Sequence, residues 1–196
     1  MAGDFTFERK PSAHFSIVYA GHIAASQNPE NLLEAMSKLE DINKGVLKLH
    51  FYGSQDVKVH QIINDLALED MVVQHGYVAH NVALQAMVNA DALLLVLPKE
   101  NSKGIMTGKV YEYLATNNYI LTLGDPEGEI AELITECGAG HTYSYTQDLL
   151  PVLSELINNW RKKEAIHQPN ETKIEQYSRK AITGQLAKIF DKLSLE

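Results

Sequence analysis

The chain has 196 residues and a formal net charge of −8, and 45% of its residues are hydrophobic. That length suits one large domain, or one domain with a helical tail, and the composition suffices for a buried core. The negative charge argues against nucleic acid and anionic membranes as direct partners, and no stretch is apolar for long enough to insert into a membrane. The single cysteine, Cys137, excludes an internal disulfide and predicts a reducing compartment, the cytoplasm.

Short apolar runs alternate with amphipathic segments along the chain. In order, the pattern predicts strands at 15–20, 46–52, 71–75, 91–97, 119–123 and 140–143, the last a weak edge strand. A first helix is predicted from Asn28, with Asn28 as its N-cap and Pro29 in its first turn. Further helices are predicted at 57–68, 81–89, just after Thr107, and at 128–136, 146–165 and 171–193.

This alternation predicts an α/β fold: a Rossmann-like three-layer sandwich with a mostly parallel sheet of about six strands, plus C-terminal helices. The expected organisation is an N-terminal lead (1–14), a Rossmann-like domain (15–170) and a C-terminal helix (171–196).

Glycines close most of the predicted strands. They are Gly21, Gly53, Gly76 and Gly124, and the loop 98–107 follows another strand. One glycine after a strand is ordinary turn chemistry. The carboxyl ends of parallel strands, however, meet at one edge of a sheet, which is where such sheets bind ligands. Five ends converging there favour a nucleotide or phosphate site.

The loop 98–107 and the helix after it contain the residues that suit an anion. Thr107 is placed as the N-cap, with Gly108 and Lys109 in the first turn, so free backbone N–H groups and an ammonium would face a phosphate. Glu112 follows Lys109 by three residues on the same helix face, where its carboxylate could accept hydrogen bonds from ribose hydroxyls. The alternative is an exposed Lys109–Glu112 ion pair, worth only about 0.2–0.5 kcal/mol. Neither a Walker motif nor a G-x-G-x-x-G motif is present.

Several segments, in this order, resemble the C-terminal, donor-binding domain of GT-B fold glycosyltransferases, and most closely the retaining group often called family 4. The resemblance covers roughly residues 15–190. It rests on YAGH at 19–22, NPENLL at 28–33, FYGS at 51–54, VQHGYV at 73–78, ADALLL at 90–95 and KVYEYLA at 109–115.

The resemblance implies roles for particular residues. Glu112 would bind the ribose hydroxyls, the turn containing Tyr77 would lie against the base, and the helix start at 107–109 would face the diphosphate. The final helix would cross back onto the other domain of the enzyme. The residues expected to bind the substrate are Gly21, His22, Gly53, Tyr77, Glu100, Gly104, Thr107, Gly108, Lys109 and Glu112.

The chain departs from the family pattern at two places. Gly104 stands where the family has a glutamate that contacts the donor sugar, and Glu100 lies nearby in the same loop. The family's arginine and lysine after the first strand are also missing, since His22 is the only candidate cation there. Lys109, or Lys103, would have to supply the positive charge for the diphosphate.

These observations predict the donor domain of a hexosyltransferase-type glycosyltransferase, which transfers a sugar from a nucleotide-diphosphate sugar to a polysaccharide or lipid-linked acceptor. It would be incomplete without an N-terminal acceptor domain or a partner chain. The alternatives are one half of a nucleotide-sugar epimerase and a degenerate nucleotide-binding domain without activity. We expect no metal and no cofactor, because the histidines are scattered without ligand spacing. The sequence does not identify the catalytic residues, the base, the sugar or the acceptor.

Overall fold

The computed structural model describes residues 8–10 and 12–193. Its strands are β1 (Phe15–Ala20), β2 (Leu47–Tyr52), β3 (Val72–Gly76), β4 (Ala92–Val96), β5 (Tyr119–Leu123) and β6 (Gly140–Tyr143). Its helices are α1 (Glu30–Ser37), α2 (Asp41–Lys44), α3 (Val57–Asp65), α4 (His80–Asn89), α5 (Gly108–Leu114), α6 (Glu129–Glu136), α7 (Leu150–Lys162), α8 (Glu171–Gln176) and α9 (Arg179–Leu193). Parts of the predicted N-terminal lead and C-terminal helix, residues 1–7, 11 and 194–196, lie outside the described residues.

The six strands form one parallel sheet in the order β3-β2-β1-β4-β5-β6. The predicted Rossmann-like fold is therefore confirmed. The chain builds from β1 outward to β3, then crosses back to place β4 on the other side of β1. Ligands of such sheets bind beyond the carboxyl ends of the strands, at the point where the strand order reverses. In this sheet that point lies between β1 and β4.

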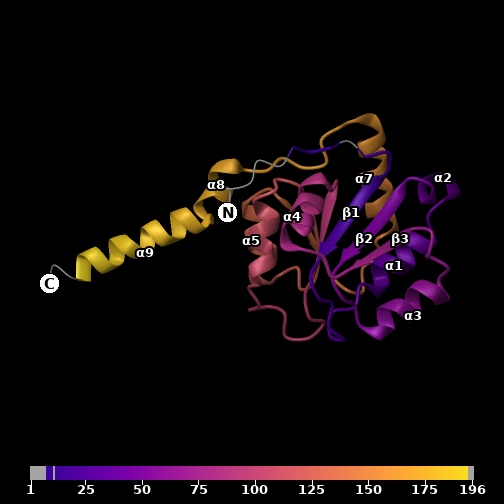
Figure 1. Ribbon diagram of the computed structural model, residues 1–196, viewed down its shortest axis with the longest axis horizontal. Coiled ribbons are helices and arrows are strands. Elements are labelled where there is room, and N and C mark those ends of the chain that lie inside the picture. Colours follow the sequence, from indigo (N-terminus) through magenta and orange to yellow (C-terminus); the bar gives the residue numbers. More distant parts are fainter. Residues whose placement is uncertain (1–7, 11, 194–196) are drawn as a thin grey trace.

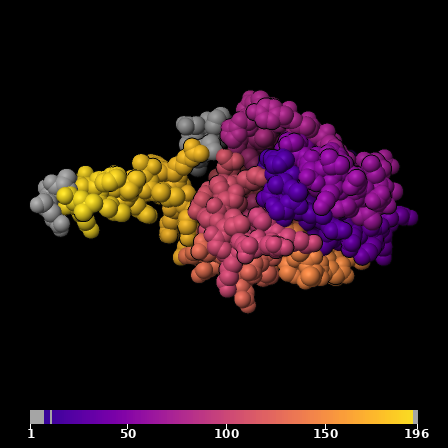
Figure 2. All heavy atoms as spheres, turned by 90° about the horizontal axis from the view of Figure 1, so that it is seen from below, coloured from indigo at the N-terminus to yellow at the C-terminus, as the bar shows by residue number. Residues whose placement is uncertain are grey.

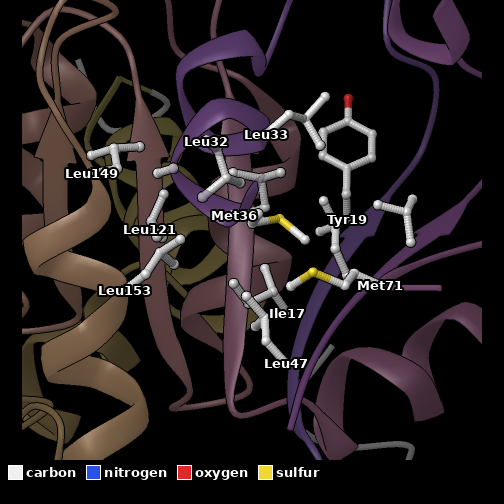
Figure 3. Packing of buried hydrophobic residues seen from close by; sticks show 14 of the residues in the cluster. Ile17, Tyr19, Leu32, Leu33, Met36, Leu47, Met71, Leu121, Leu149 and Leu153 are labelled. Carbon is white, nitrogen blue, oxygen red and sulfur yellow. The ribbon is translucent and has the colours of Figure 1, made fainter. Parts of the chain in front are cut away.

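Helices cover both faces of the sheet (Figure 1). On one face, α1, α3 and α7 pack against the strands through an apolar cluster that includes Leu32, Met36 and Leu153 (Figure 3). On the other face, α4, α5 and α6 pack through a second cluster that includes Val110 and Ile134. Strands β4 and β5 are buried at every residue, because both of their faces are covered. The outer strand β3 is exposed over its second half.

The start of α1 differs from the prediction. The helix begins at Glu30, and Pro29 occupies the N-cap position without a side-chain hydrogen bond. The predicted cap at Asn28 is wrong, because the amide of Asn28 donates to Glu30 Oε2 (3.3 Å) and does not turn back onto the helix. The four-residue helix α2 was not predicted, since it is too short to show a helical period.

The predicted C-terminal helix is two helices. Helix α8 ends at Gln176, with Tyr177 as its C-cap. The Oγ of Ser178 then accepts a hydrogen bond from the N–H of Ala181 (3.1 Å) at the start of α9, which runs in a new direction (Figure 1). Lys173 and Tyr177 fix α8 to the body through the carboxylate of Glu136. Helix α9 instead extends away from the body and has no buried residue (Figures 1 and 2).

No helix in the described part of the chain is long and apolar enough to cross a bilayer.

Candidate functional site

Two glycines join the ends of β1, β2 and β3 at the carboxyl edge of the sheet. The N–H of Gly21 donates to the carbonyl of Tyr52 (2.7 Å), and the N–H of Gly53 donates to the carbonyl of Gly76 (2.7 Å). Gly21 and Gly53 have φ values of +123° and +126°, which L side chains rarely adopt. A Cβ on Gly53 would lie 2.2 Å from the carbonyl oxygen of Gly21, so no side chain fits between the two turns. The two turns therefore pack backbone against backbone at this edge.

Thr107 stands at the start of α5, as expected for the N-cap. Its Oγ1 accepts a hydrogen bond from the N–H of Lys109 at 3.5 Å, a long contact. Gly108 is exposed, and a Cβ placed there would meet no atom within 4 Å. The local structure of 107–109 thus matches the helix start that the sequence predicts.

The side chain of Lys109 does not pair with Glu112. Its Nζ donates to the hydroxyl of Tyr19 (2.5 Å) and lies 4.2 Å from the centre of the Tyr19 ring. It also packs against Gly21, where a Cβ would come within 2.7 Å of Lys109 Cε. Within residues 8–10 and 12–193, no carboxylate lies within 4.0 Å of this ammonium. The exposed ion pair that the spacing alone would explain is absent there.

Lys109 is a partly buried cation. Burial lowers the pKa of its ammonium to about 8, although the charge of Glu112 partly offsets this effect. Burial also raises the pKa of the Tyr19 hydroxyl, which therefore stays a neutral phenol. The ammonium of Lys109 contacts a neutral hydroxyl and an aromatic face, and neither of them cancels its positive charge, which remains available to an anion.

The loops after β1, β2 and β4 are joined by hydrogen bonds. The Nδ1 of His22 contacts the Oγ of Ser54 (2.8 Å), and the N–H of Lys99 donates to the carbonyl of Ser26 (2.9 Å). The amide of Gln27 donates to the carbonyl of Val96 (2.8 Å). These bonds bring together the two loops that flank the reversal of strand order.

The remaining expected residues are exposed on the loops around this edge. Tyr77 is 96% exposed. Glu100 and Gly104 are exposed in the loop after β4, and a Cβ on Gly104 would meet nothing within 4 Å. Lys103, the second candidate cation, lies 4.0 Å from the Glu127 carboxylate. The structure thus joins Gly21 and Gly53 with Lys109, whereas Tyr77, Glu100 and Gly104 remain peripheral to that contact.

Sequence reasoning missed two features of the site. Tyr19 lies ninety positions before Lys109 in the sequence, at the end of a buried strand, and no local pattern links the two residues. Lys99 is a further cation, 5.7 Å from the centre of the Tyr145 ring.

The histidines, expected to be scattered, include one close pair. His50 Nδ1 lies 3.0 Å from His75 Nε2, and the Tyr52 ring stacks on His75 with centroids 4.0 Å apart. The pKa of His50 is lowered to about 4, first by burial and then by the charge of His75. Within the described ranges, no three His, Cys, Asp or Glu residues come together to hold a metal ion.

A hollow of about 610 Å³ lies at the opposite, amino edge of the sheet, between the ends of α7, β4 and β5. Most of its charged groups have partners in the fold, although among the described residues none is seen for the side chains of Lys163 and Glu164. Arg9 pairs with Asp91 (2.7 Å), Arg161 donates to Asn43 Oδ1 (2.6 Å), and His167 Nε2 contacts the carbonyl of Asn117 (3.0 Å). This hollow is a weaker candidate for an anionic ligand than the carboxyl edge, despite its size.

A scan against protein-family models finds no match. A comparison with curated proteins also finds none.

Solved structures do match this fold. A sucrose-phosphate synthase from Thermosynechococcus elongatus superposes with a TM-score of 0.72 at 14% identity, over 95% of this chain and 47% of the synthase chain. HepE from Anabaena, in complex with UDP-glucose, superposes with a TM-score of 0.70 at 14% identity, over 91% of this chain and 49% of HepE.

A third structure contains one domain only. It is the C-terminal domain of LpcC, a glycosyl transferase group 1 family protein from Francisella tularensis. This domain superposes with a TM-score of 0.62 at 13% identity, over 87% of this chain and 94% of the domain. The chain thus spans about half of HepE and of the synthase, but nearly all of an isolated C-terminal domain. It has the fold of the C-terminal domain of a GT-B glycosyltransferase.

Proposed function

We propose that this chain is the donor half of a glycosyltransferase and binds a nucleotide-diphosphate sugar at the carboxyl edge of its sheet. The observation that carries the proposal is Lys109, whose partly buried ammonium lies beside Gly21, next to the reversal of strand order. A cation held at this point by a neutral partner suits a diphosphate. HepE, which shares the fold, has been crystallised with UDP and with UDP-glucose, and this supports the same ligand class.

The assigned roles follow from position. Lys109 would offset the charge of the diphosphate, assisted by the backbone of Thr107 and Gly108. Glu112, which is half-buried on the same helix, would accept hydrogen bonds from the ribose hydroxyls. The remaining residues would line the site, with the base near Tyr77 and the donor sugar near the loop after β4: Gly21, His22, Gly53, Glu100 and Gly104.

A second domain would complete the enzyme, either in the same polypeptide or on another chain. The apolar side chains of α9 are spaced to form one face of the helix, and each is 45–64% exposed: Ile182, Leu186, Ile189, Phe190 and Leu193. A continuous apolar face of this kind calls for a partner. We propose that the acceptor half covers it, and that transfer of a hexose to a polysaccharide or lipid-linked acceptor needs both halves.

The test is calorimetric titration of the chain with UDP, GDP and ADP and with the corresponding nucleosides. At least one nucleoside diphosphate should bind at least about tenfold more tightly than its nucleoside, the least that one charge-assisted contact would give. The chain alone should transfer no sugar from a nucleotide sugar to an acceptor. If every diphosphate binds no better than its nucleoside, the proposed site is wrong; transfer by the chain alone would show that no second half is needed.

The absence of a side chain at Gly104 favours one alternative, a nucleotide-binding domain without activity. A donor domain should bind the nucleotide sugar at least as tightly as the free nucleoside diphosphate, because the sugar gains contacts of its own. A degenerate domain should lose affinity when the sugar is attached. The epimerase alternative is separated from both by product analysis, since an epimerase changes the sugar without transferring it.

A further inference from the structure

Tyr19 lies at the centre of the contacts around Lys109. Its ring is completely buried on the α1 face of the sheet, beside Leu33 and 6.0 Å from the centre of the Phe51 ring. Figure 3 shows the ring fixed in the apolar cluster, with the hydroxyl pointing out of it. That hydroxyl donates to the carbonyl of His22 (2.7 Å) and accepts from Lys109 Nζ (2.5 Å).

Hydrogen-bond chemistry fixes which group donates in each of these two hydrogen bonds. A phenol has one hydrogen, and here it goes to the carbonyl of His22, so the Tyr19 oxygen can only accept from Lys109. An ammonium has three N–H groups, and Tyr19 occupies one of them. The others remain available to a ligand.

Without Tyr19, Lys109 would have a competing partner. Glu112 lies three residues along α5 and already attracts the ammonium, although the two groups do not form an ion pair. A flexible lysine without its hydroxyl partner would swing towards this carboxylate. The two charges of the site would then neutralise each other.

We propose that Tyr19 is a positioning residue that keeps Lys109 apart from Glu112, so that the cation serves the diphosphate while the carboxylate serves the ribose. This inference rests on the proposed function. It also explains how the site can bind a diphosphate although no lysine or arginine follows β1. The ammonium of Lys109 comes from α5 instead, and Tyr19 of β1 holds it at the end of that strand.

The variant Tyr19→Phe keeps the buried ring and removes the hydroxyl. The probe is inorganic pyrophosphate, which has no ribose and so reports on Lys109 alone. Pyrophosphate affinity should fall about tenfold in Tyr19→Phe, the loss of one well-placed charge contact. Adding Glu112→Gln removes the competing carboxylate and should restore most of that loss. If Tyr19→Phe binds pyrophosphate as the wild type does, the proposal is wrong.

Tyr119→Phe is the matched control. Tyr119 is also buried in this sheet, and its hydroxyl contacts that of Tyr143 at 2.9 Å, away from Lys109. The control should lose stability as Tyr19→Phe does, with pyrophosphate binding unchanged. An equal loss of binding in both variants would mean that Tyr19 acts only through general stability.

A second readout needs no ligand, so it separates this inference from the proposed function. The titratable groups around the pair are His22 after β1, Glu112 and Tyr113 on α5, and Tyr145 after β6. In the free wild type, NMR titration should place the pKa of Lys109 near 8. In Tyr19→Phe it should rise, because Lys109 then pairs with Glu112. An unchanged pKa would contradict the inference even if the protein binds nucleotides; failure of the wild type to bind any diphosphate, with the pKa shift present, would overturn only the proposed function.

Discussion

The two edges of the sheet differ in how the charge next to the central strands β1 and β4 is paired. At the amino edge, Asp91 accepts from both Arg9 (2.7 Å) and the N–H of Ser16 (2.8 Å). At the carboxyl edge, Lys109 is held by a neutral phenol, with the carboxylate of Glu112 nearby but unpaired with it. A charge that is already paired within the fold is less available to a ligand than a cation kept from its nearest carboxylate. The edge where the partly buried cation has no carboxylate partner is the one we assign to binding.

The largest expected effect tests the backbone of the carboxyl edge. Gly53→Ala would force its Cβ against the carbonyl of Gly21 at a φ that alanine rarely adopts, and should lower the free energy of unfolding by about 3–5 kcal/mol. The matched control is Gly104→Ala, which meets nothing within 4 Å and should stay within about 0.5 kcal/mol of the wild type. Urea denaturation measures both; equal effects would mean that the contact between the two turns carries no stability.

Replacing the cation should separate binding from stability. Lys109→Met should weaken nucleoside diphosphate binding by about 1.5–3 kcal/mol and leave nucleoside binding nearly unchanged, because only the diphosphate contacts the ammonium. Calorimetric titration of both ligands measures the difference. Equal losses for the two ligands would make Lys109 a structural residue.

The same variant should stabilise the free protein at about pH 7. The folded-state pKa of Lys109 is lowered to about 8 from 10.5, so the unfolded chain binds the proton more tightly and the charged form opposes folding below that pH. As the pH rises from about 8 towards the unfolded value, the wild type should gain stability relative to Lys109→Met. We expect an advantage of about 1–2 kcal/mol for the variant near pH 7, reduced from the full shift because the lysine is partly exposed. A variant that is less stable at every pH would contradict this account.

Glu112, at the same edge, should contribute to nucleotide affinity only through its contact with the ribose. Glu112→Gln keeps the shape but loses the charge, and should cost about 1.5–3 kcal/mol of nucleotide affinity with little change in stability. A 2′,3′-dideoxy nucleotide is the control, since it should bind the wild type and the variant equally weakly. Tight binding of the dideoxy ligand to the wild type would show that Glu112 does not contact the ribose.

The smallest effect belongs to the amino edge. Arg9→Ala removes an ion pair whose arginine side chain is 52% exposed, and should cost at most about 1 kcal/mol of stability. Nucleotide binding should not change. A loss of nucleotide affinity in this variant would mean that the amino edge also contributes to nucleotide binding.

Most of the fold could be predicted, because strands and helices leave local patterns in the sequence. The mostly apolar runs at 15–20 and 119–123 coincide with β1 and β5, because parallel strands that are covered on both faces need mainly apolar residues. The break between α8 and α9 was missed, because it depends on the contact of Tyr177 with Glu136, forty-one positions earlier in the sequence. Ser178, which starts α9, was a capping signal that the sequence did contain.

The site was predictable only in part, for the same reason. The capped start of α5 is local, and the structure places Thr107 as the sequence predicts. The spacing of Lys109 and Glu112 left an ion pair and a binding site as alternatives. What distinguishes them is Tyr19, which meets Lys109 only once β1 and α5 have packed. A tertiary contact of this kind leaves no periodic signal in a single sequence.

The most direct test of the central claim is an amide NMR titration of the wild-type chain with a nucleoside diphosphate. We predict that the shifted amides cluster at the carboxyl edge, at Gly21, Gly53, Tyr77 and the start of α5 from 107 to 109, while those around Asp91 and His167 stay in place. Shifts concentrated around the hollow at the amino edge, with the carboxyl edge unchanged, would contradict the account.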